Sequence, residues 1–317
     1  MRAVIYDEFG GIDVLHVGDI TLEEPRDHEI QVEPIAVSVN PIDGKVRRGE
    51  LKLMSGGHFP KRTGQDFSGT VRAVGKKVQR WKVGDEVFGC ARGMKDGALG
   101  EAVNVPEDFV ALRPRSIPHS TAAALPMVTI AAYQALHRVV RIDHDTSVLV
   151  NGCTGGFGLM AMQLARRAGA RVTGVCSTAA LEIASEYGAD LVIDYRTQNV
   201  SELPARYDVI LELSGHLPFD QAAHILSAHA SYIDVSPSPA SIVGNAIANP
   251  VRHQKHKLLL SKAHSKDLGV IASLIDDGDL RPPPVHLYPF EEFADAFQTA
   301  ESGSLIGKNV IQIRDEP

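Results

Sequence analysis

The chain has 317 residues, of which 44% are hydrophobic and 22% charged, a composition typical of a soluble globular protein with about two domains. Its net charge of −7 argues against a nucleic-acid partner, and the densest basic stretch, residues 252–257, is short and followed by an apolar run. Three scattered cysteines without a CxxC pair exclude a disulfide framework and favour a reducing compartment. We expect a cytoplasmic protein without membrane contact, because the N-terminus lacks a signal-peptide core and no stretch has the roughly 18 apolar residues of a membrane span.

The first part of the chain, up to about residue 118, has the pattern of a β-rich domain. Its clearest strands are expected at residues 30–37, 67–75 and 83–89, each bounded by Gly, Pro or Asp. Many short strands separated by turns predict a barrel-like module.

The pattern changes at Ser120, where an Ala-rich helix is predicted over residues 121–136. Strands then alternate with helices as far as Leu260, which indicates a doubly wound α/β domain. The later strands are predicted at residues 208–213, 230–235 and 257–261. The remaining segment has a helix near 268–277, the rigid prolines 282–284, a helix over 290–300 and a strand over 307–313. Because it cannot bury its apolar faces alone, we expect it to return to the first domain.

A glycine-rich turn between residues 147 and 177 carries the strongest functional signal. An apolar strand at 148–150 precedes the turn, a helix ended by Gly169 follows it, and a second strand spans 171–176. Glycines here leave room for a phosphate, and the start of the helix points at it, so the arrangement predicts a nicotinamide dinucleotide site. The cofactor-binding candidates in the turn are Gly152, Gly155, Gly156, Phe157 and Gly158.

The end of the second strand favours NADPH over NADH as the cofactor. An acidic residue there would bind the ribose hydroxyl of NAD, but the strand end has none, and Arg196 beyond the third strand could supply positive charge. The alternative is that Ser177 only caps the next helix and Arg196 is a solvated loop residue, and residues 179–180 provide no basic side chain. The candidates here are Ser177, Thr178, Tyr195 and Arg196.

Short motifs extend along nearly the whole chain: residues 40–43, 64–69, 81–89, 125–126 with Thr129 and 131–136, the glycine turn, and 301–303 with Gly307 and Lys308. Their order resembles the medium-chain dehydrogenase/reductase superfamily, and within it the zinc-independent quinone oxidoreductase branch with the zeta-crystallin-like reductases. The resemblance implies an α/β fold with a GroES-like β-rich catalytic domain from residues 1–120 and 262–317. A Rossmann domain with a doubly wound parallel sheet would span residues 121–261, and the active site would lie in the cleft. We also expect a homodimer.

The chain departs from the zinc-dependent members of the superfamily at the metal ligands. Those members carry a cysteine where this chain has Asn40, a His-Glu pair where it has Gln65 and Asp66, and a lobe of four close cysteines that is absent here. Because catalytic zinc needs about three protein ligands, we expect no metal. His253 and His256 lie in a polar run and are expected on the surface. Without a Lewis acid, a quinone or α,β-unsaturated carbonyl is the expected acceptor, since conjugation spreads the developing charge.

The resemblance places Asn40, Asp43 and Lys45 at the active site. Asn40 could donate to a carbonyl oxygen or simply shape the turn before Pro41, and Asp43 with Lys45 could instead be an exposed pair. Other quinone reductases have a tyrosine at the place of Lys45, so a proton-donor role does not follow for it. Thr129 corresponds to a residue near the nicotinamide, although a helix threonine can also serve packing. Gln65 and Asp66 could be core polar residues that hold their loop.

The sequence therefore predicts an NADPH-dependent, zinc-free oxidoreductase that transfers hydride to a small-molecule quinone or enone. One alternative is an enoyl-thioester reductase of the same superfamily. Another is a non-catalytic NADPH-binding protein with a structural or regulatory role.

Overall fold

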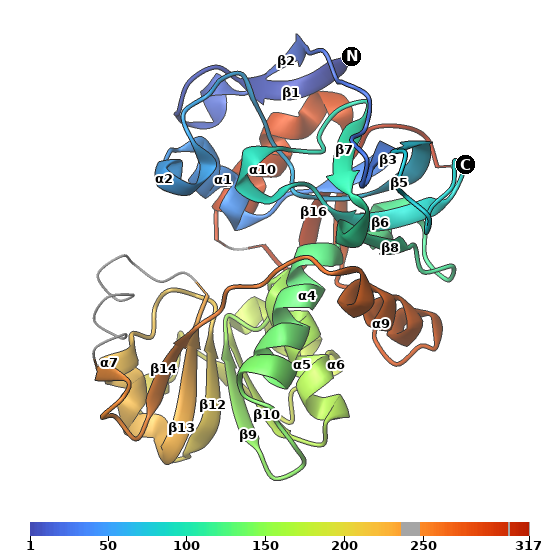
Figure 1. Cartoon of the computed structure of the whole chain (residues 1–317). Helices are drawn as coiled ribbons and strands as arrows, with labels where there is room; N and C mark the ends of the chain where they lie inside the picture. Colours follow the sequence, from blue (N-terminus) through green and yellow to red (C-terminus); the bar gives the residue numbers. More distant parts are fainter. Residues whose placement is uncertain (236–247, 304, 317) are drawn as a thin grey trace. The chain divides into compact units, whose positions relative to one another are not determined.

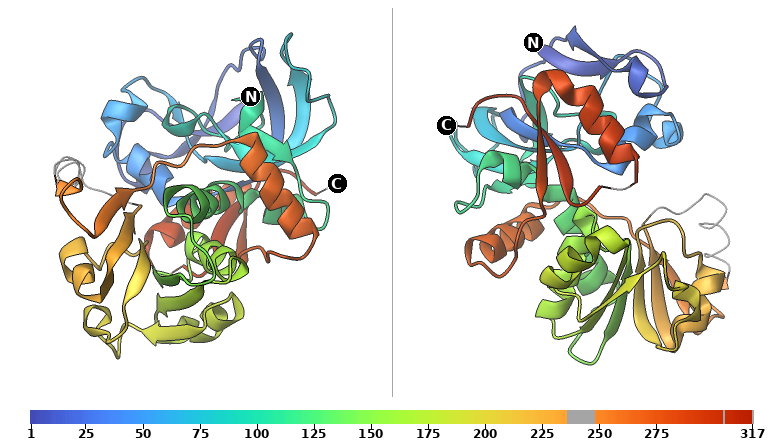
Figure 2. Two further views of the ribbon diagram at one scale, coloured as in Figure 1. Left: turned by 60° about the horizontal axis from the view of Figure 1, so that its bottom comes forward. Right: turned by 180° about the vertical axis from the view of Figure 1, so that it is seen from behind.

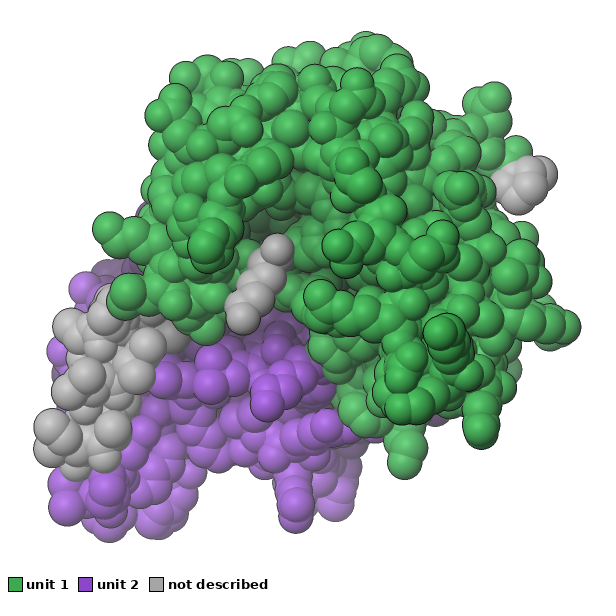
Figure 3. Space-filling model, turned by 45° about the horizontal axis from the view of Figure 1, so that its top comes forward, with its two compact units in different colours: residues 1–130, 263–317 green, residues 131–262 purple. Residues whose placement is uncertain are grey.

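Both ends of the chain contribute to one folded unit, and the middle of the chain forms another. In the computed structural model, residues 1–130 and 263–317 make up the first unit and residues 131–262 the second (Figure 3). The structure describes residues 1–235, 248–303 and 305–316. The boundaries predicted from the sequence lie after residues 120 and 261.

The first unit is built on a mixed sheet whose central strand is the ten-residue β3 (Figure 1). The strand order is β15-β16-β3-β5-β6-β8, and β7 also pairs with β3. The register between β3 and β5 shifts after Pro34, which has no N–H to donate to the ladder. The strands are β3 (Glu29–Ser38), β5 (Asp66–Val74), β6 (Glu86–Cys90), β7 (Val103–Pro106), β8 (Val110–Leu112), β15 (Val285–Pro289) and β16 (Lys308–Gln312).

The C-terminal segment completes this sheet. Strand β16 lies antiparallel to β3, with Val310 opposite Ser38, and helix α10 (Phe293–Glu301) packs on β16 and buries Phe297 (Figure 2). The sequence analysis expected the helix and the strand β16 but missed β15, which follows the prolines at 282–284. Its proline-bounded, largely exposed residues lack the alternation of a half-buried strand.

A three-stranded sheet and several short helices complete the first unit. The small sheet has the order β2-β1-β4. The expected single helix over 121–136 is wrong, because Pro126 cannot donate a backbone hydrogen bond and therefore begins a new helix. These elements are β1 (Arg2–Tyr6), β2 (His16–Asp19), β4 (Lys61–Arg62), α1 (Pro41–Arg47), α2 (Lys52–Ser55), α3 (His119–Ala123), α4 (Pro126–Gln134) and α9 (Ser265–Asp276). The last residues of α4 belong to the second unit, where a π-helical turn (Ala135–Val139) follows them.

The second unit contains a six-stranded parallel sheet with the order β11-β10-β9-β12-β13-β14. This order is that of a doubly wound dinucleotide-binding fold, and the predicted α/β fold class is confirmed. The strand order reverses at β9, since β10 and β11 follow on one side of it and β12, β13 and β14 on the other. The elements are β9 (Ser147–Asn151), α5 (Gly156–Arg167), β10 (Arg171–Cys176), α6 (Leu181–Glu186), β11 (Leu191–Asp194), β12 (Tyr207–Glu212), α7 (Phe219–Ala222), β13 (Leu226–Asp234) and β14 (Lys255–Leu258).

Strand β14 corrects one expectation, since His256 is buried rather than on the surface. It lies opposite Tyr232 of β13, and its ring stacks on Phe219 at 5.1 Å and meets Tyr232 edge-on at 4.8 Å. The polar neighbours of His256 concealed a strand position that faces the core. Within the described residues, no helix has the length and apolar character needed to cross a membrane.

Candidate active site

A cluster of buried polar side chains surrounds the ammonium group of Lys308 in the first unit. Lys308 Nζ donates to Asn40 Oδ1 at 2.6 Å and to the carbonyl oxygen of Val39 at 2.7 Å. Asn40 Nδ2 in turn donates to Asp66 Oδ2 at 3.0 Å. We call this set the Lys308 cluster, and each of its members is at most 6% exposed: Asn40, Asp43, Asp66, Cys90 and Lys308.

The local sequence explains why Asn40 and Asp43 meet. Asn40 has extended backbone angles and precedes α1, whose first residue is Pro41. The carboxylate of Asp43, three residues later, accepts the backbone N–H of Asn40 at 2.8 Å, as in a capping box. The start of α1 therefore fixes the backbone from which the Asn40 amide projects.

Asp66 joins three parts of the first unit. It begins β5, and its Oδ2 accepts the backbone N–H of Met127 at 3.1 Å in addition to the Asn40 amide. Its Oδ1 accepts the thiol of Cys90, the last residue of β6, at 3.2 Å. One carboxylate thus links α1, β6 and the first turn of α4.

The burial of this cluster shifts the protonation of its members. Burial raises the pKa of Asp43 to about 7 and also raises the pKa of Asp66, although Lys308 opposes both shifts. Burial lowers the pKa of Lys308 against the attraction of the two carboxylates, and it raises the pKa of the Cys90 thiol well above its usual range. The thiol is therefore neutral near pH 7, while Asp43 titrates there.

The donor set of this cluster does not fit a catalytic zinc ion. At the expected ligand positions, the amide oxygen of Asn40 is bonded to Lys308, and Gln65 Nε2 donates to the carbonyl oxygen of Asp96 at 2.7 Å. The described part of the chain has no group of three or more His, Cys, Asp or Glu side chains that could hold a metal. The ammonium group itself provides the cationic charge that the buried carboxylates require.

The predicted catalytic residues occupy different environments. Asp43 is 3% exposed, so the alternative of an exposed Asp43–Lys45 pair is wrong for Asp43. Its carboxylate turns back to the backbone N–H of Asn40 instead of facing solvent. Lys45 is half-buried on the same helix. Thr129 is fully buried on α4 and donates its hydroxyl to the carbonyl oxygen of Leu125 at 2.6 Å, which favours the packing role that we left open.

In the second unit, the glycine turn after β9 has the geometry of a phosphate cradle. Gly152 has a φ of 86°, a conformation that favours glycine, and a Cβ on Gly158 would lie 2.5 Å from the backbone of Cys153. A Cβ on Gly155 would meet no atom within 4 Å, so open space lies where the twelve-residue helix α5 begins. Unpaired N–H groups at a helix start and an open cradle fit the pyrophosphate of a dinucleotide.

The structure brings the four strand-end candidates of the second unit together. Cys176 of β10 lies opposite Asp194 of β11, and the N–H of Tyr195 donates to the carbonyl oxygen of Cys176 at 3.2 Å. The residues that follow these two strands are therefore neighbours across the sheet edge: Ser177, Thr178, Tyr195 and Arg196.

A carboxylate that the sequence analysis did not count lies among these candidates. Asp194 accepts the Thr178 hydroxyl at 2.5 Å and the Arg196 N–H at 2.9 Å, and these bonds lower its pKa, that of Thr178 having the largest effect. The prediction that the strand end has no acidic residue therefore holds for β10 but not for its neighbour β11. Register between β10 and β11, which strand composition does not reveal, places the Asp194 charge beside Thr178.

Another polar group, which was not predicted from the sequence, lies between β9 and β12, where the strand order reverses. Asn151 ends β9, and its amide donates to Glu212 Oε2 of β12 at 2.6 Å and to Ser214 Oγ at 2.9 Å. Ligands of doubly wound sheets bind beside this switch point. The available signal was Glu212 directly after the apolar run of residues 209–211.

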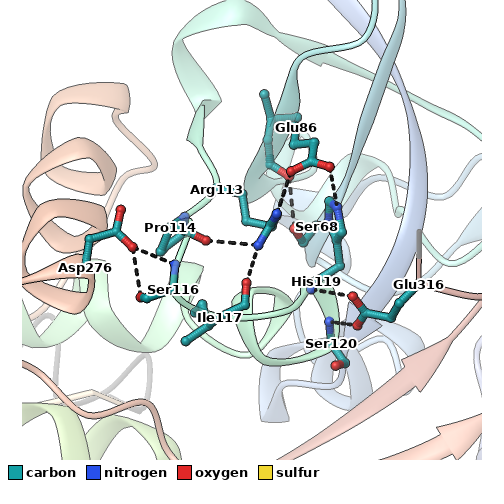
Figure 4. A network of polar contacts seen from close by, with 11 residues as sticks. Ser68, Glu86, Arg113, Pro114, Ser116, Ile117, His119, Ser120, Asp276 and Glu316 are labelled. Carbon is teal, nitrogen blue, oxygen red and sulfur yellow. Dashed lines mark hydrogen bonds and ion pairs between the residues drawn. The ribbon is translucent and has the colours of Figure 1, made fainter. Parts of the chain in front are cut away.

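A Ser-His-Glu arrangement in the first unit is structural rather than nucleophilic (Figure 4). Ser68 Oγ lies 2.8 Å from His119 Nδ1, and His119 Nε2 lies 3.8 Å from Glu86. Ser68 is fully buried and donates its proton to the carbonyl oxygen of Val87, whereas a nucleophilic serine gives its proton to the histidine. The same network attaches the chain end, because Glu316 accepts the N–H groups of His119 and Ser120 at 2.9 and 2.7 Å.

Comparison with known proteins identifies the relatives of this chain. Residues 26–115 match the alcohol dehydrogenase GroES-like domain family, and residues 187–311 match the family described as zinc-binding dehydrogenase. The NADPH-dependent alkenal/one oxidoreductase of Arabidopsis thaliana is 30% identical over 322 residues, covering 98% of this chain and 79% of that protein. A chloroplast envelope quinone oxidoreductase homolog of the same plant is 28% identical and covers 98% of both chains. The quinone oxidoreductase of Coxiella burnetii superposes with a TM-score of 0.89 at 26% identity over 99% of both chains. This chain therefore belongs to the medium-chain dehydrogenase/reductase superfamily, in its quinone oxidoreductase branch.

Proposed function

We propose that this chain is an NADPH-dependent oxidoreductase that transfers hydride to a quinone or an α,β-unsaturated carbonyl without zinc. The observation that carries the proposal is the Lys308 cluster, in which Asn40, at the position expected for a zinc-ligating cysteine, is hydrogen-bonded to an ammonium group and a carboxylate. Bound NADPH supplies the hydride from its nicotinamide ring. The glycine turn and the start of α5 would hold its pyrophosphate.

Asn40 is the proposed donor to the substrate oxygen. Its amide nitrogen carries two hydrogens, of which Asp66 accepts one, so the second can stabilise negative charge on the acceptor. Lys308 holds the amide oxygen and thereby fixes which side of the amide presents its N–H groups. A single neutral donor is weaker than zinc, and this favours a conjugated acceptor that spreads the charge.

Selectivity for the 2′-phosphate of NADPH would come from Ser177 and the exposed Arg196. Asp194 opposes this selectivity in part, since its carboxylate lies beside Thr178. A preference for NADPH therefore requires Arg196 to outweigh Asp194 at the phosphate. A cytoplasmic location and a homodimer remain our predictions from the sequence.

The test uses NADPH deuterated at the transferred position, with quinones, enones and enoyl thioesters as acceptors and a chelator in parallel samples. We expect deuterium at the β-carbon of a reduced enone and equal rates with and without chelator. Asn40→Ala should lower kcat by about 10²-fold, as removal of one oxyanion donor does, with NADPH affinity nearly unchanged in a fluorescence titration. Asn104→Ala, which removes an amide on β7 in the same unit, serves as the control.

Three outcomes would count against the proposal. Loss of activity in chelator would reassign the chemistry to a metal. An Asn40→Ala variant as fast as the control would remove Asn40 from the mechanism. Binding of NADPH without turnover on any acceptor would favour the non-catalytic alternative, and turnover on enoyl thioesters alone would favour the thioester reductase.

A further inference from the structure

Two free cysteines lie together at the glycine turn of the second unit. The backbone N–H of Cys153 donates to the carbonyl oxygen of Val175 at 3.1 Å, which places the turn directly against the end of β10. A Cβ on Gly174 would lie 2.9 Å from Cys153 Sγ. Alternate residues of a strand face the same side, so the side chain of Cys176 shares that side with Gly174. The Cys153 sulfur therefore packs on the face of β10 that carries the Cys176 side chain, and each thiol affects the ionisation of the other.

The proximity of the two thiols makes them chemically unequal. Interaction with the Cys153 thiol lowers the pKa of Cys176, whereas interaction with Cys176, together with burial, raises the pKa of Cys153. Cys176 is therefore the sulfur that becomes a thiolate first, and thiolates are the nucleophilic form. Both side chains are buried, and Cys176, at 4% exposed against 0% for Cys153, is the more accessible of the two, two residues before the exposed Thr178.

We propose that Cys153 and Cys176 are a redox-sensitive modification site, which a peroxide converts to a disulfide that weakens NADPH binding at the turn. In the first step, the Cys176 thiolate attacks one peroxide oxygen, the O–O bond breaks, and one water and a sulfenic acid result after proton transfer. In the second step, the Cys153 sulfur attacks the sulfenic sulfur, the S–O bond breaks, and the second water leaves. Overall, two thiols lose two electrons and two protons, and one peroxide is reduced to two waters.

The effect on the cofactor follows from the position of Cys153 within the turn. This part of the inference rests on the proposed cofactor site at residues 152–158. Disulfide geometry brings the two Cβ atoms to about 3.8 Å, which ties the turn covalently to β10. Cys153 also contacts Gly158 closely, so a shift of its backbone displaces the first turn of α5.

Peptide mapping by mass spectrometry tests the modification without any cofactor. After treatment of the reduced protein with hydrogen peroxide, we expect a peptide pair joined through Cys153 and Cys176 that dithiothreitol separates again. Cys90, the buried thiol of the first unit, is the internal control and should remain unlinked. Recovery of both thiols unchanged, or of their sulfinic acids without a linked pair, would overturn the proposal.

Fluorescence titration with NADPH tests the consequence. Oxidised protein should bind NADPH at least tenfold more weakly than reduced protein, and dithiothreitol should restore the affinity. In Cys153→Ala and in Cys176→Ala, the same treatment should change the affinity by less than twofold, whatever the starting affinity of each variant. Linked protein with full affinity would refute the coupling, whereas reduced protein that does not bind NADPH would refute the cofactor site instead.

The coupling must also act in the opposite direction. If the disulfide weakens cofactor binding tenfold, saturating NADP⁺ should raise the reduction potential of the pair by about 30 mV, the value of a tenfold change for two electrons. The potential can be measured by mapping the linked fraction in glutathione buffers. A potential unaffected by NADP⁺ would contradict the proposed link between the thiols and the cofactor.

Discussion

At the scale of single residues, Lys308 orients Asn40 and balances the charge of the buried carboxylates. Its ammonium group donates a hydrogen bond to Asn40 and lies near Asp43 and Asp66. A buried carboxylate needs such a partner because unpaired buried charge is costly. The same arrangement leaves Asp43 with one buried carboxylate oxygen that has no hydrogen-bond partner. Burial of this carboxyl group, one oxygen of which has no partner, is the physical reason for the raised pKa of Asp43.

Asp43 should make stability fall as pH rises. Its folded-state pKa of about 7 lies above the ordinary 3.8, so the folded state binds the proton more tightly than the unfolded state does. The free energy of unfolding that this proton adds is complete below pH 4 and is lost by about pH 7. The difference corresponds to roughly 4 kcal/mol at most. In denaturant unfolding between pH 4 and pH 8, Asp43→Asn should therefore gain stability relative to the unsubstituted protein as pH increases.

Asp13→Asn, at an exposed carboxyl of the same unit, is the control and should show no such trend. A constant difference between Asp43→Asn and the unsubstituted protein across this pH range would mean that Asp43 is ionised throughout.

At the scale of elements, a substitution in the glycine turn can weaken cofactor binding without changing the stability of the fold. Gly155 has a φ of −70°, which alanine adopts, and a Cβ there meets open space. Gly155→Ala should therefore keep the free energy of unfolding within about 1 kcal/mol and still weaken NADPH binding at least tenfold, because the methyl group enters the cradle.

Gly158→Ala is the matched contrast on the same turn. Its Cβ would overlap the backbone of Cys153, so we expect a loss of about 1–3 kcal/mol in unfolding free energy as well as weaker binding. Thermal unfolding and NADPH titration of both variants check this. Equal effects of the two variants on stability would show that the space beside Gly155 is not open.

Local patterns were predictable from the sequence, and long-range contacts were not. The glycine turn was found because strand, turn and helix are adjacent in the chain, so spacing alone reveals them. Lys308 and Asn40 are 268 residues apart, and no periodicity reports a contact between such positions. The register that brings Asp194 to Thr178 likewise depends on which strands pair. Chemistry that depends on tertiary contacts therefore appeared only in the structure.

At the scale of the whole molecule, the last residues fasten the first unit. The carboxylate of Glu316 accepts the backbone N–H groups of His119 and Ser120 at the start of α3. Burial alone would raise the pKa of Glu316, but the hydrogen bonds from Ser120 and His119 outweigh burial and lower this pKa. Glu316→Ala should cost about 1 kcal/mol of unfolding free energy at pH 7, as the loss of a helix cap does. The lowered pKa means that this contribution is present above about pH 4.5 and disappears in acid.

Asp315→Ala, one residue earlier and exposed, is the control for that measurement. Chemical unfolding at pH 7 and pH 3 compares the two variants with the unsubstituted protein. A cost for Glu316→Ala that equals that of the control, or that persists at pH 3, would mean that the carboxylate does not cap α3.

The discontinuous first unit sets an order of events during synthesis on the ribosome. Residues 131–262 are contiguous, so the second unit can fold as soon as they emerge, whereas the first unit lacks β16 until residues 308–312 have been made. Until then, residues 36–38 of β3 lack a partner strand on one side, and Asp43 and Asp66 lack the ammonium group of Lys308. Residues 1–130 therefore remain incompletely folded and accessible to chaperones and proteases while residues 131–262 fold first.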